Sequence, residues 1–184
     1  MNLNTFDQRY KEAVEQMAIK GSEKTFNNSG PIHASIVMTS IYRNAKDNIK
    51  LYTKDLQGEI GRFLDYMTSM NDYINSNKSF QILINERPHF ESDLFDTILN
   101  ASKTIKGVEL RFASPTFVKE VDSYANKNSH FCIADDKMFR LEYDNYNHQA
   151  LCGFNSPKVV SKFCLLYTSP SPRDQRGSRM PSSA

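Results

Sequence analysis

The ionisable residues with the spacing of a chemical site lie in one stretch, Ser129–Tyr143, with the sequence SHFCIADDKMFRLEY. Apolar and polar residues alternate on both sides of a central Asp-Asp-Lys turn, a pattern that predicts two short strands folded back as a hairpin. Alternate residues of a strand share a face, and a neighbouring strand lies about 5 Å away. The side chains expected to lie near one another are therefore His130, Asp135, Arg140 and Glu142.

Two kinds of chemistry fit these residue types. A histidine with two carboxylates could bind a metal ion or act as a general base, so His130, Asp135 and Glu142 are the candidate catalytic residues. A guanidinium, an ammonium or an amide could hold a phosphate or another ligand. The candidates for that role are Arg140, Lys137 and Asn155. No metal site is assigned and no cofactor is expected.

A purely structural interpretation competes with both chemistries. Arg140 and Glu142 would form a cross-strand ion-pair network, Asp135 and Asp136 would cap the turn, and His130 would be a polar residue satisfied by its neighbours. Two further histidines have no partner pattern and are predicted to be surface or helix residues. These are His33 and His148.

Helices alternating with short apolar strands must position this hairpin. The predicted helices are Thr5–Lys20, Ile32–Lys46, Gly58–Asn75, Phe90–Ile105, Phe117–Asn126 and a last one starting at Pro157. The predicted strands outside the hairpin are Ile49–Thr53, Phe80–Asn85, Val108–Ala113 and Ala150–Phe154. This order predicts an α/β domain with a layered, mixed β-sheet flanked by helices.

The length of 184 residues and the 39% hydrophobic fraction fit one domain with a core. We expect residues 1–31 to form an N-terminal helix and a linker at Ser22–Pro31, and residues 32–163 to form the α/β domain. The segment Cys164–Ala184 is rich in Ser, Pro and Arg and cannot bury a core, so disorder is expected there. Reverse-translated, it resembles read-through from a sequencing adapter, which would truncate the final helix near Phe163.

Charge argues against a nucleic-acid partner. The tail's charged residues account for the whole net charge of +2, and the remaining chain has equal numbers of basic and acidic residues. Phosphate binding needs a surplus of Lys and Arg on at least one face. The tail residues concerned are Arg173, Asp174, Arg176 and Arg179.

The two cysteines outside the tail, Cys132 and Cys152, lack CxxC spacing and are interpreted as reduced thiols, with a bridge between them left open. The polar start of the chain does not resemble a signal peptide. Nowhere does an apolar run approach the roughly 18 residues that cross a bilayer. A cytoplasmic protein without a membrane span is therefore expected.

Several stretches resemble one half of a phospholipase D superfamily domain. They are IKLYT, ILNASKTIKGVELRFAS, HFCIADDKMFR and ALCGFNSPKVVSKF, and the resemblance covers roughly residues 32–163. It implies a phospholipase D-like half domain. Single-half members assemble their site across a two-fold axis, so the resemblance also implies a homodimer.

The motif of the active members is not preserved. Those enzymes carry a histidine, a lysine two residues on and an aspartate five residues later. The histidine forms a phosphohistidine, while lysine and a downstream asparagine hold the phosphate oxygens. With Asp135 as the aspartate, the first two places fall on Asn128 and His130. With Asp136 they fall on Ser129 and Phe131. The family's Gly-Ser step is replaced by Gly-Phe-Asn at residues 153–155.

Three functions follow from this departure. The one favoured is a degenerate, non-catalytic phospholipase D-like module that binds a protein, a phosphate-bearing ligand or a second copy of itself. The second is a phosphodiesterase or nuclease-like hydrolase that uses substituted site residues. The third is a nucleic-acid-binding module without chemistry, against which the balanced charge argues.

Overall fold

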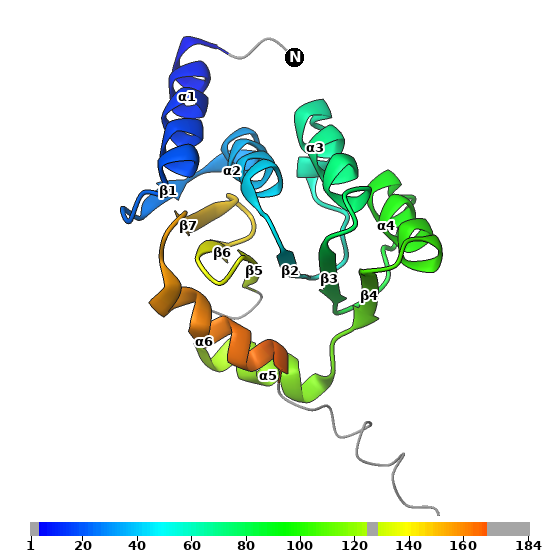
Figure 1. Cartoon of the computed structure of the whole chain (residues 1–184). Helices are drawn as coiled ribbons and strands as arrows, with labels where there is room; N and C mark the ends of the chain where they lie inside the picture. The colour runs from blue at the N-terminus through cyan, green and yellow to red at the C-terminus, as the bar shows by residue number, and fades with distance from the viewer. Residues whose placement is uncertain (1–3, 125–128, 169–184) are drawn as a thin grey trace, which may run out of the picture.

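The computed structural model describes residues 4–124 and 129–168, along which helices and strands alternate (Figure 1). The helices are α1 (Thr5–Lys20), α2 (Gly30–Asn44), the short 3-10 helix η1 (Glu59–Arg62), α3 (Leu64–Ile74), α4 (Asp93–Thr104), α5 (Pro115–Tyr124) and α6 (Pro157–Thr168). The strands are β1 (Phe26–Asn28), β2 (Asn48–Thr53), β3 (Ser79–Ile84), β4 (Val108–Phe112), β5 (His130–Ala134), β6 (Met138–Asp144) and β7 (Gln149–Gly153).

All seven strands form one mixed sheet in the order β1-β7-β6-β5-β2-β3-β4. β2, β3 and β4 are parallel, whereas each pairing from β2 through β5, β6 and β7 to β1 is antiparallel. This confirms the predicted α/β class with a mixed sheet flanked by helices. We call the edge of the sheet where β2, β3 and β4 end the carboxyl edge, and the opposite edge the amino edge. Because β5 is antiparallel to β2, its first residue, His130, lies at the carboxyl edge.

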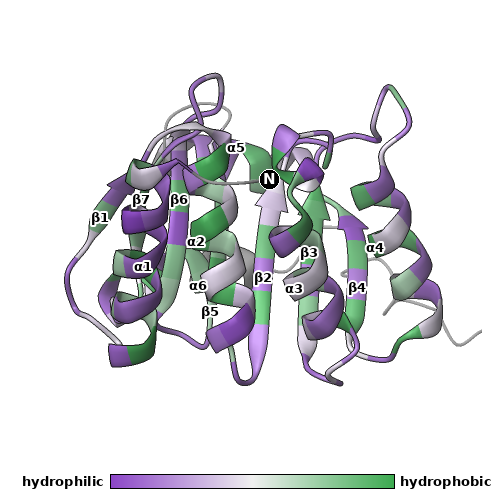
Figure 2. Cartoon of the chain, turned by 90° about the horizontal axis from the view of Figure 1, so that it is seen from above, coloured by the Kyte–Doolittle hydropathy of each residue, from purple (hydrophilic) through white to green (hydrophobic). Residues whose placement is uncertain are grey.

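Helices cover both faces of the sheet. α1, α2, α3 and α4 lie on one side, and α5 and α6 lie together on the other (Figure 1). The strands require this cover: in β5, every residue from Phe131 to Ala134 is buried, so neither face can meet water. Figure 2 shows the strands in the order given above and colours much of α1 hydrophilic, as expected for a helix with one solvent-facing side.

Two apolar clusters fill the space between the layers. The larger joins the sheet to α1, α2, α3 and α4, and includes fully buried Val14, Ile41 and Ile82. The smaller lies under α5 and α6 and is rich in aromatic rings, with the tilted rings of Phe131 and Phe163 4.9 Å apart between centroids. Side chains of one strand alternate between these clusters, which fixes the register of the sheet.

The segment Ser22–Pro31, predicted to be a linker, contains an edge strand instead. β1 pairs antiparallel with β7, with Phe26 opposite Cys152. Helix α1 also belongs to the domain core, because Val14 and Ala18 are buried in the larger cluster. Residues from Thr5 onwards therefore fold with the sheet rather than ahead of it.

The first predicted helix has the expected bounds, three others are displaced by one to three residues at their ends, and two differ more. The helix expected over residues 58–75 is broken into η1 and α3, because Phe63 between them has extended backbone, with ψ 120°. α6 continues to Thr168, past the expected boundary at Phe163. The rest of the tail, residues 169–184, lies outside the described residues, so its disorder and its origin in an adapter stay predictions.

The predicted hairpin is confirmed, and its turn is anchored to the rest of the fold. Asp135 and Asp136 both have positive φ, at 50° and 55°, as the two central residues of a type I′ hairpin turn do. The carboxylate of Asp135 accepts hydrogen bonds from the backbone N–H groups of Lys46, Asp47 and Asn48, at 2.6, 2.9 and 3.1 Å. This residue ties the β5–β6 turn to the start of β2 at the amino edge.

Replacing Asp135 with Ala removes the acceptor of three backbone donors, and we expect it to lower the free energy of unfolding by about 1–3 kcal/mol. Asp136→Ala is the matched control, because it makes the same change at the neighbouring positive φ without touching those donors. Urea denaturation of both variants measures the difference. Equal destabilisation by the two substitutions would contradict the anchoring role.

Candidate functional site

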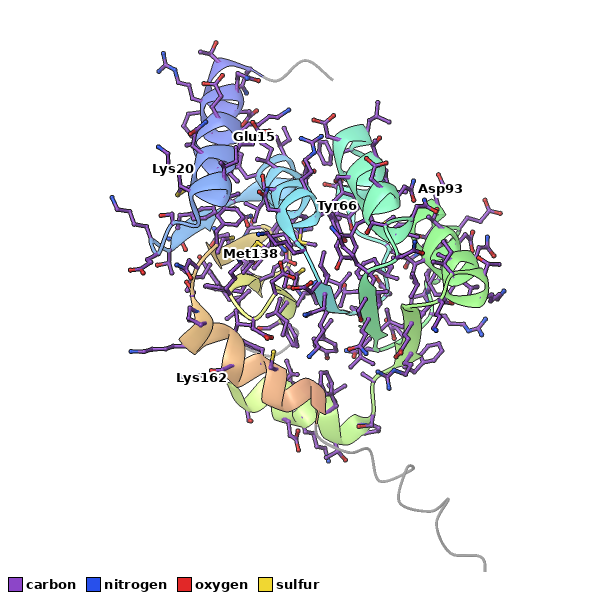
Figure 3. All side chains as sticks on the ribbon, viewed as in Figure 1. Glu15, Lys20, Tyr66, Asp93, Met138 and Lys162 are labelled. Carbon is purple, nitrogen blue, oxygen red and sulfur yellow. The ribbon has the colours of Figure 1, made fainter. Side chains whose placement is uncertain are left out.

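A cavity of about 330 Å³ opens at the carboxyl edge, between the sheet and helices α2 and α3. Figure 3 shows Tyr66, one of its lining residues, between these two helices. One wall is apolar and includes Ala34, Met38, Leu51, Leu56, Tyr66 and Leu94. The other wall is polar and includes His130, Arg140, Glu142, Asn145 and His148.

Sheet register brings the polar wall together. His130 of β5 lies directly opposite Glu142 of β6, and Arg140 lies opposite both Cys132 of β5 and Cys152 of β7. His130 and Cys132 are two residues apart on β5, and Arg140 and Glu142 are two apart on β6. All four side chains therefore share the face that α2 covers. Of the four side chains predicted to lie near one another, His130, Arg140 and Glu142 do so, whereas Asp135 lies at the opposite edge of the sheet.

The Glu142 carboxylate is the centre of the polar wall. Arg140 donates to it from both terminal nitrogens, at 3.2 and 3.3 Å. Nδ1 of His148 lies 2.8 Å from one carboxylate oxygen and Nδ1 of His130 lies 3.2 Å from the other. Glu142 is only 4% exposed and Arg140 only 6%. We call Arg140, Glu142, His130 and His148 the Glu142 cluster.

Electrostatics keep the carboxylate at the centre of the Glu142 cluster ionised. Burial opposes ionisation of Glu142, but hydrogen bonds from both histidines and the charge of Arg140 outweigh it, so the pKa of this carboxyl lies well below its usual range. In turn, the hydrogen bond to Glu142 raises the pKa of His148 above 6.5, against the opposing effects of partial burial and of Arg140. Glu142 is therefore ionised throughout the neutral range.

His130 uses both ring nitrogens. The backbone N–H of Lys54 points at its Nε2 from 3.3 Å, and the Asn145 side-chain amide lies 3.2 Å from the same atom. A backbone N–H can only donate, so Nε2 is the acceptor and Nδ1 carries the hydrogen that His130 gives to Glu142. The contacts thus assign the Nδ1–H tautomer to His130.

Strand β1, which the sequence did not predict, holds His148 in place. Asn28, at the end of β1, donates from its amide to the carbonyl of His148 at 2.7 Å and accepts from Nε of Arg140 at 3.0 Å. The first residue of α2, Gly30, donates its N–H to the carbonyl of Asn147 at 2.9 Å. His148 itself sits at φ 50°, a strained conformation that these contacts maintain.

Sequence reasoning placed His148 on the surface or in a helix and gave Asn28 no role. An available signal was Asp144, whose carboxylate accepts from the N–H groups of Tyr146 and Asn147, both at 3.1 Å. Such an aspartate marks a turn. A turn at this point folds β7 back on β6 and returns His148 to Glu142. For Asn28, a strand of three residues gives too short a pattern to find.

The other predicted site residues lie at the amino edge. Asp135 accepts from the start of β2, and the carbonyl of Lys137 accepts from the N–H of Ser156, next to Asn155. The length of β2, six residues, separates this edge from His130, which corresponds to roughly 16 Å. Asp135, Lys137 and Asn155 therefore do not share the cavity with His130, Arg140 and Glu142.

His33 and the two cysteines are engaged elsewhere or buried. His33 lies in α2, where its Nε2 is 3.0 Å from Asp7 and its ring stacks on Tyr10. Cys132 and Cys152 are free thiols, and burial raises the pKa of each to about 12, so both stay protonated. Among the described residues no group of three or more His, Cys, Asp or Glu side chains is arranged to hold a metal ion.

Chemically, this arrangement offers one histidine oriented by a carboxylate and a cavity wall with its charges paired. The first is the geometry of a general base or nucleophile. The second suits a ligand without strong charge, because the Arg140 guanidinium already faces Glu142 and Asn28. Within residues 4–124 and 129–168, no helix has the length and apolar character to span a membrane.

No protein-family model and no curated protein sequence matches this chain. Several solved structures resemble it, among them one archaeal and two bacterial proteins. TrmBL2, an archaeal chromatin protein with a novel mode of DNA binding, has a TM-score of 0.53 at 14% identity over 96% of this chain, which spans 62% of its length. The phospholipase D family member Nuc from Salmonella typhimurium has a TM-score of 0.52 at 16% identity, over 84% of this chain and 95% of its own. NucT from Helicobacter pylori has a TM-score of 0.55 at 14% identity, over 78% and 92%.

At these identities the likeness concerns the fold. It shows that the chain has a phospholipase D-like fold, which confirms the resemblance drawn from the sequence.

We expect His148→Gln to destabilise the protein more at pH 5.5 than at pH 8.5. The folded-state pKa of His148 is raised, so its charged contact with Glu142 stabilises fully below the unfolded pKa of about 6.5 and fades as pH rises through the folded value. Urea denaturation at both pH values measures this. The control is His89→Gln, at a side chain 66% exposed. A loss of stability independent of pH would argue against a charged His148.

Proposed function

We propose that this chain is a non-catalytic phospholipase D-like domain that acts as a binding or interaction module. The observation that carries the proposal is the Glu142 cluster: Arg140, His130 and His148 all direct their hydrogen-bonding groups at one buried carboxylate. Groups that satisfy one another stabilise the sheet and are not free to stabilise a reacting phosphate.

Phosphodiester cleavage requires cations at the phosphate oxygens, and the cavity offers none that is unpaired among the described lining residues. Arg140 is held by Glu142 and by Asn28. Lys54, the lysine at the cavity rim, places its Nζ 3.2 Å from Glu86. A phosphate that bound here would have to break an existing ion pair first.

The alternative is a phosphodiesterase, and one observation favours it. His130 stands at the carboxyl edge with its Nδ1 hydrogen directed to Glu142, so its Nε2 lone pair could attack phosphorus while Glu142 orients the ring. Two of the similar structures are NucT and the phospholipase D family member Nuc. Against it stands the hydrogen bond from the Lys54 N–H, which occupies that same nitrogen.

Two other parts of the proposal concern partners. TrmBL2 binds DNA, which supports a nucleic-acid partner, whereas the balanced charge of residues 1–163 argues against one. A homodimer follows from the resemblance to single-half members. The side chains of Phe90 and Tyr146, 81% and 93% exposed, supply apolar surface that a second copy could cover. A cytoplasmic location belongs to the same proposal.

We expect no turnover of bis(4-nitrophenyl) phosphate or of plasmid DNA above the buffer rate, at neutral pH. His130→Ala should leave that background unchanged, because no reaction depends on the residue. His89→Ala, at an exposed histidine outside the cavity, is the matched control. Turnover that disappears in His130→Ala and persists in His89→Ala would establish the hydrolase instead.

A further inference from the structure

We propose that the cavity at the carboxyl edge binds a small uncharged organic molecule with an apolar body and one hydrogen-bonding head. This inference rests on the proposed binding function and names its ligand class. The argument uses three properties of the cavity: its size, the balance of its charges and the hydrogen-bonding atoms that its polar wall presents.

The size and the apolar wall define the body of the ligand. A volume of about 330 Å³ lies at the small end of ligand sites, which run from roughly 300 to 1,000 Å³. Met38 of α2, Leu51 of β2 and Leu94 of α4 line the space from three different elements. An apolar ring or short chain would gain burial against all three, while a chain of sugar or nucleotide units would exceed the volume.

Charge balance defines the net charge of the ligand. Arg140 pairs with Glu142, and Lys54 pairs with Glu86. The two lining histidines, which can carry a positive charge, pair with Glu142, and the second carboxylate of the lining, Asp55, accepts from the N–H of Gln57 at 2.9 Å. A phosphate would therefore meet two carboxylates, Glu142 and Asp55, without an unpaired cation among the described lining residues, and its desolvation would not be offset.

The polar wall defines the head of the ligand. His148 contacts Glu142 through Nδ1, and within the described part of the chain no hydrogen bond or ion pair engages its Nε2. The ring lines the cavity and is 22% exposed, so this nitrogen can meet a ligand. A carbonyl, hydroxyl or amide group can pair with Nε2 whether or not it carries a hydrogen.

The test uses the neutral fluorescent probe N-phenyl-1-naphthylamine with the full chain, followed by displacement with three compounds of equal apolar body. Benzamide, benzoate and phenyl phosphate carry an uncharged head, one negative charge and about two. We expect saturable probe binding, and displacement by benzamide at concentrations at least ~10-fold lower than by phenyl phosphate. Absence of saturable binding, or displacement led by phenyl phosphate, would overturn the ligand class.

Two matched substitutions test whether the probe binds in this cavity. Leu51→Phe fills the cavity from β2, whereas Leu83→Phe makes the same change on the adjacent strand β3, in the apolar cluster of the other face. We expect Leu51→Phe to weaken probe binding at least ~10-fold and Leu83→Phe less than ~2-fold. If Leu51→Phe does not fold, as judged by circular dichroism, Ala34→Leu fills the same cavity from α2. Equal weakening by the filling variant and Leu83→Phe would contradict the site.

The outcome is separate from that of the phosphodiesterase assay. Turnover that depends on His130 would refute the non-catalytic function even if benzamide binds. Failure of the probe to bind in a protein that shows no turnover would refute only the ligand class.

Discussion

The rest of this structure depends on the buried, ionised carboxylate of Glu142. A charge taken out of water must be paired and hydrogen-bonded, because its desolvation is otherwise far larger than the net stability of a domain. Arg140 supplies the pair, and both histidines supply hydrogen bonds. Meeting this requirement fixes the register of β5 on β6 and holds the 144–148 loop against α2, with β1 as the outer support.

This constraint also limits the chemistry that the fold can perform. In open α/β sheets, ligands bind at the carboxyl ends of the parallel strands. Here a histidine stands at that edge, but the cation beside it, Arg140, is bound to Glu142 and Asn28 beneath a largely apolar cavity. The same side chains that stabilise the sheet thus leave a pocket suited to an uncharged ligand.

Local patterns predicted the parts of the fold that local physics determines. Alternation along β5 and β6 was enough to find the hairpin and to bring His130, Arg140 and Glu142 to one face. What the patterns could not give was decided by long-range pairing. Three residues of β1 are strand only because β7 offers an edge, and Asp135 serves backbone groups of residues 46–48 that are remote in sequence. His148 reaches Glu142 only after β7 has folded back on β6.

A double-mutant cycle on Arg140→Met and Glu142→Gln, measured as the free energy of unfolding, tests the central claim most directly. If the pair is a buried structural contact, each single variant leaves its partner uncompensated and loses about 3–5 kcal/mol. The double variant should then be at least as stable as the less stable of the two single variants, which corresponds to a favourable coupling between the sites. Single variants that both remain within about 0.5 kcal/mol of the parent would contradict the account, because these charges would then be held for another purpose.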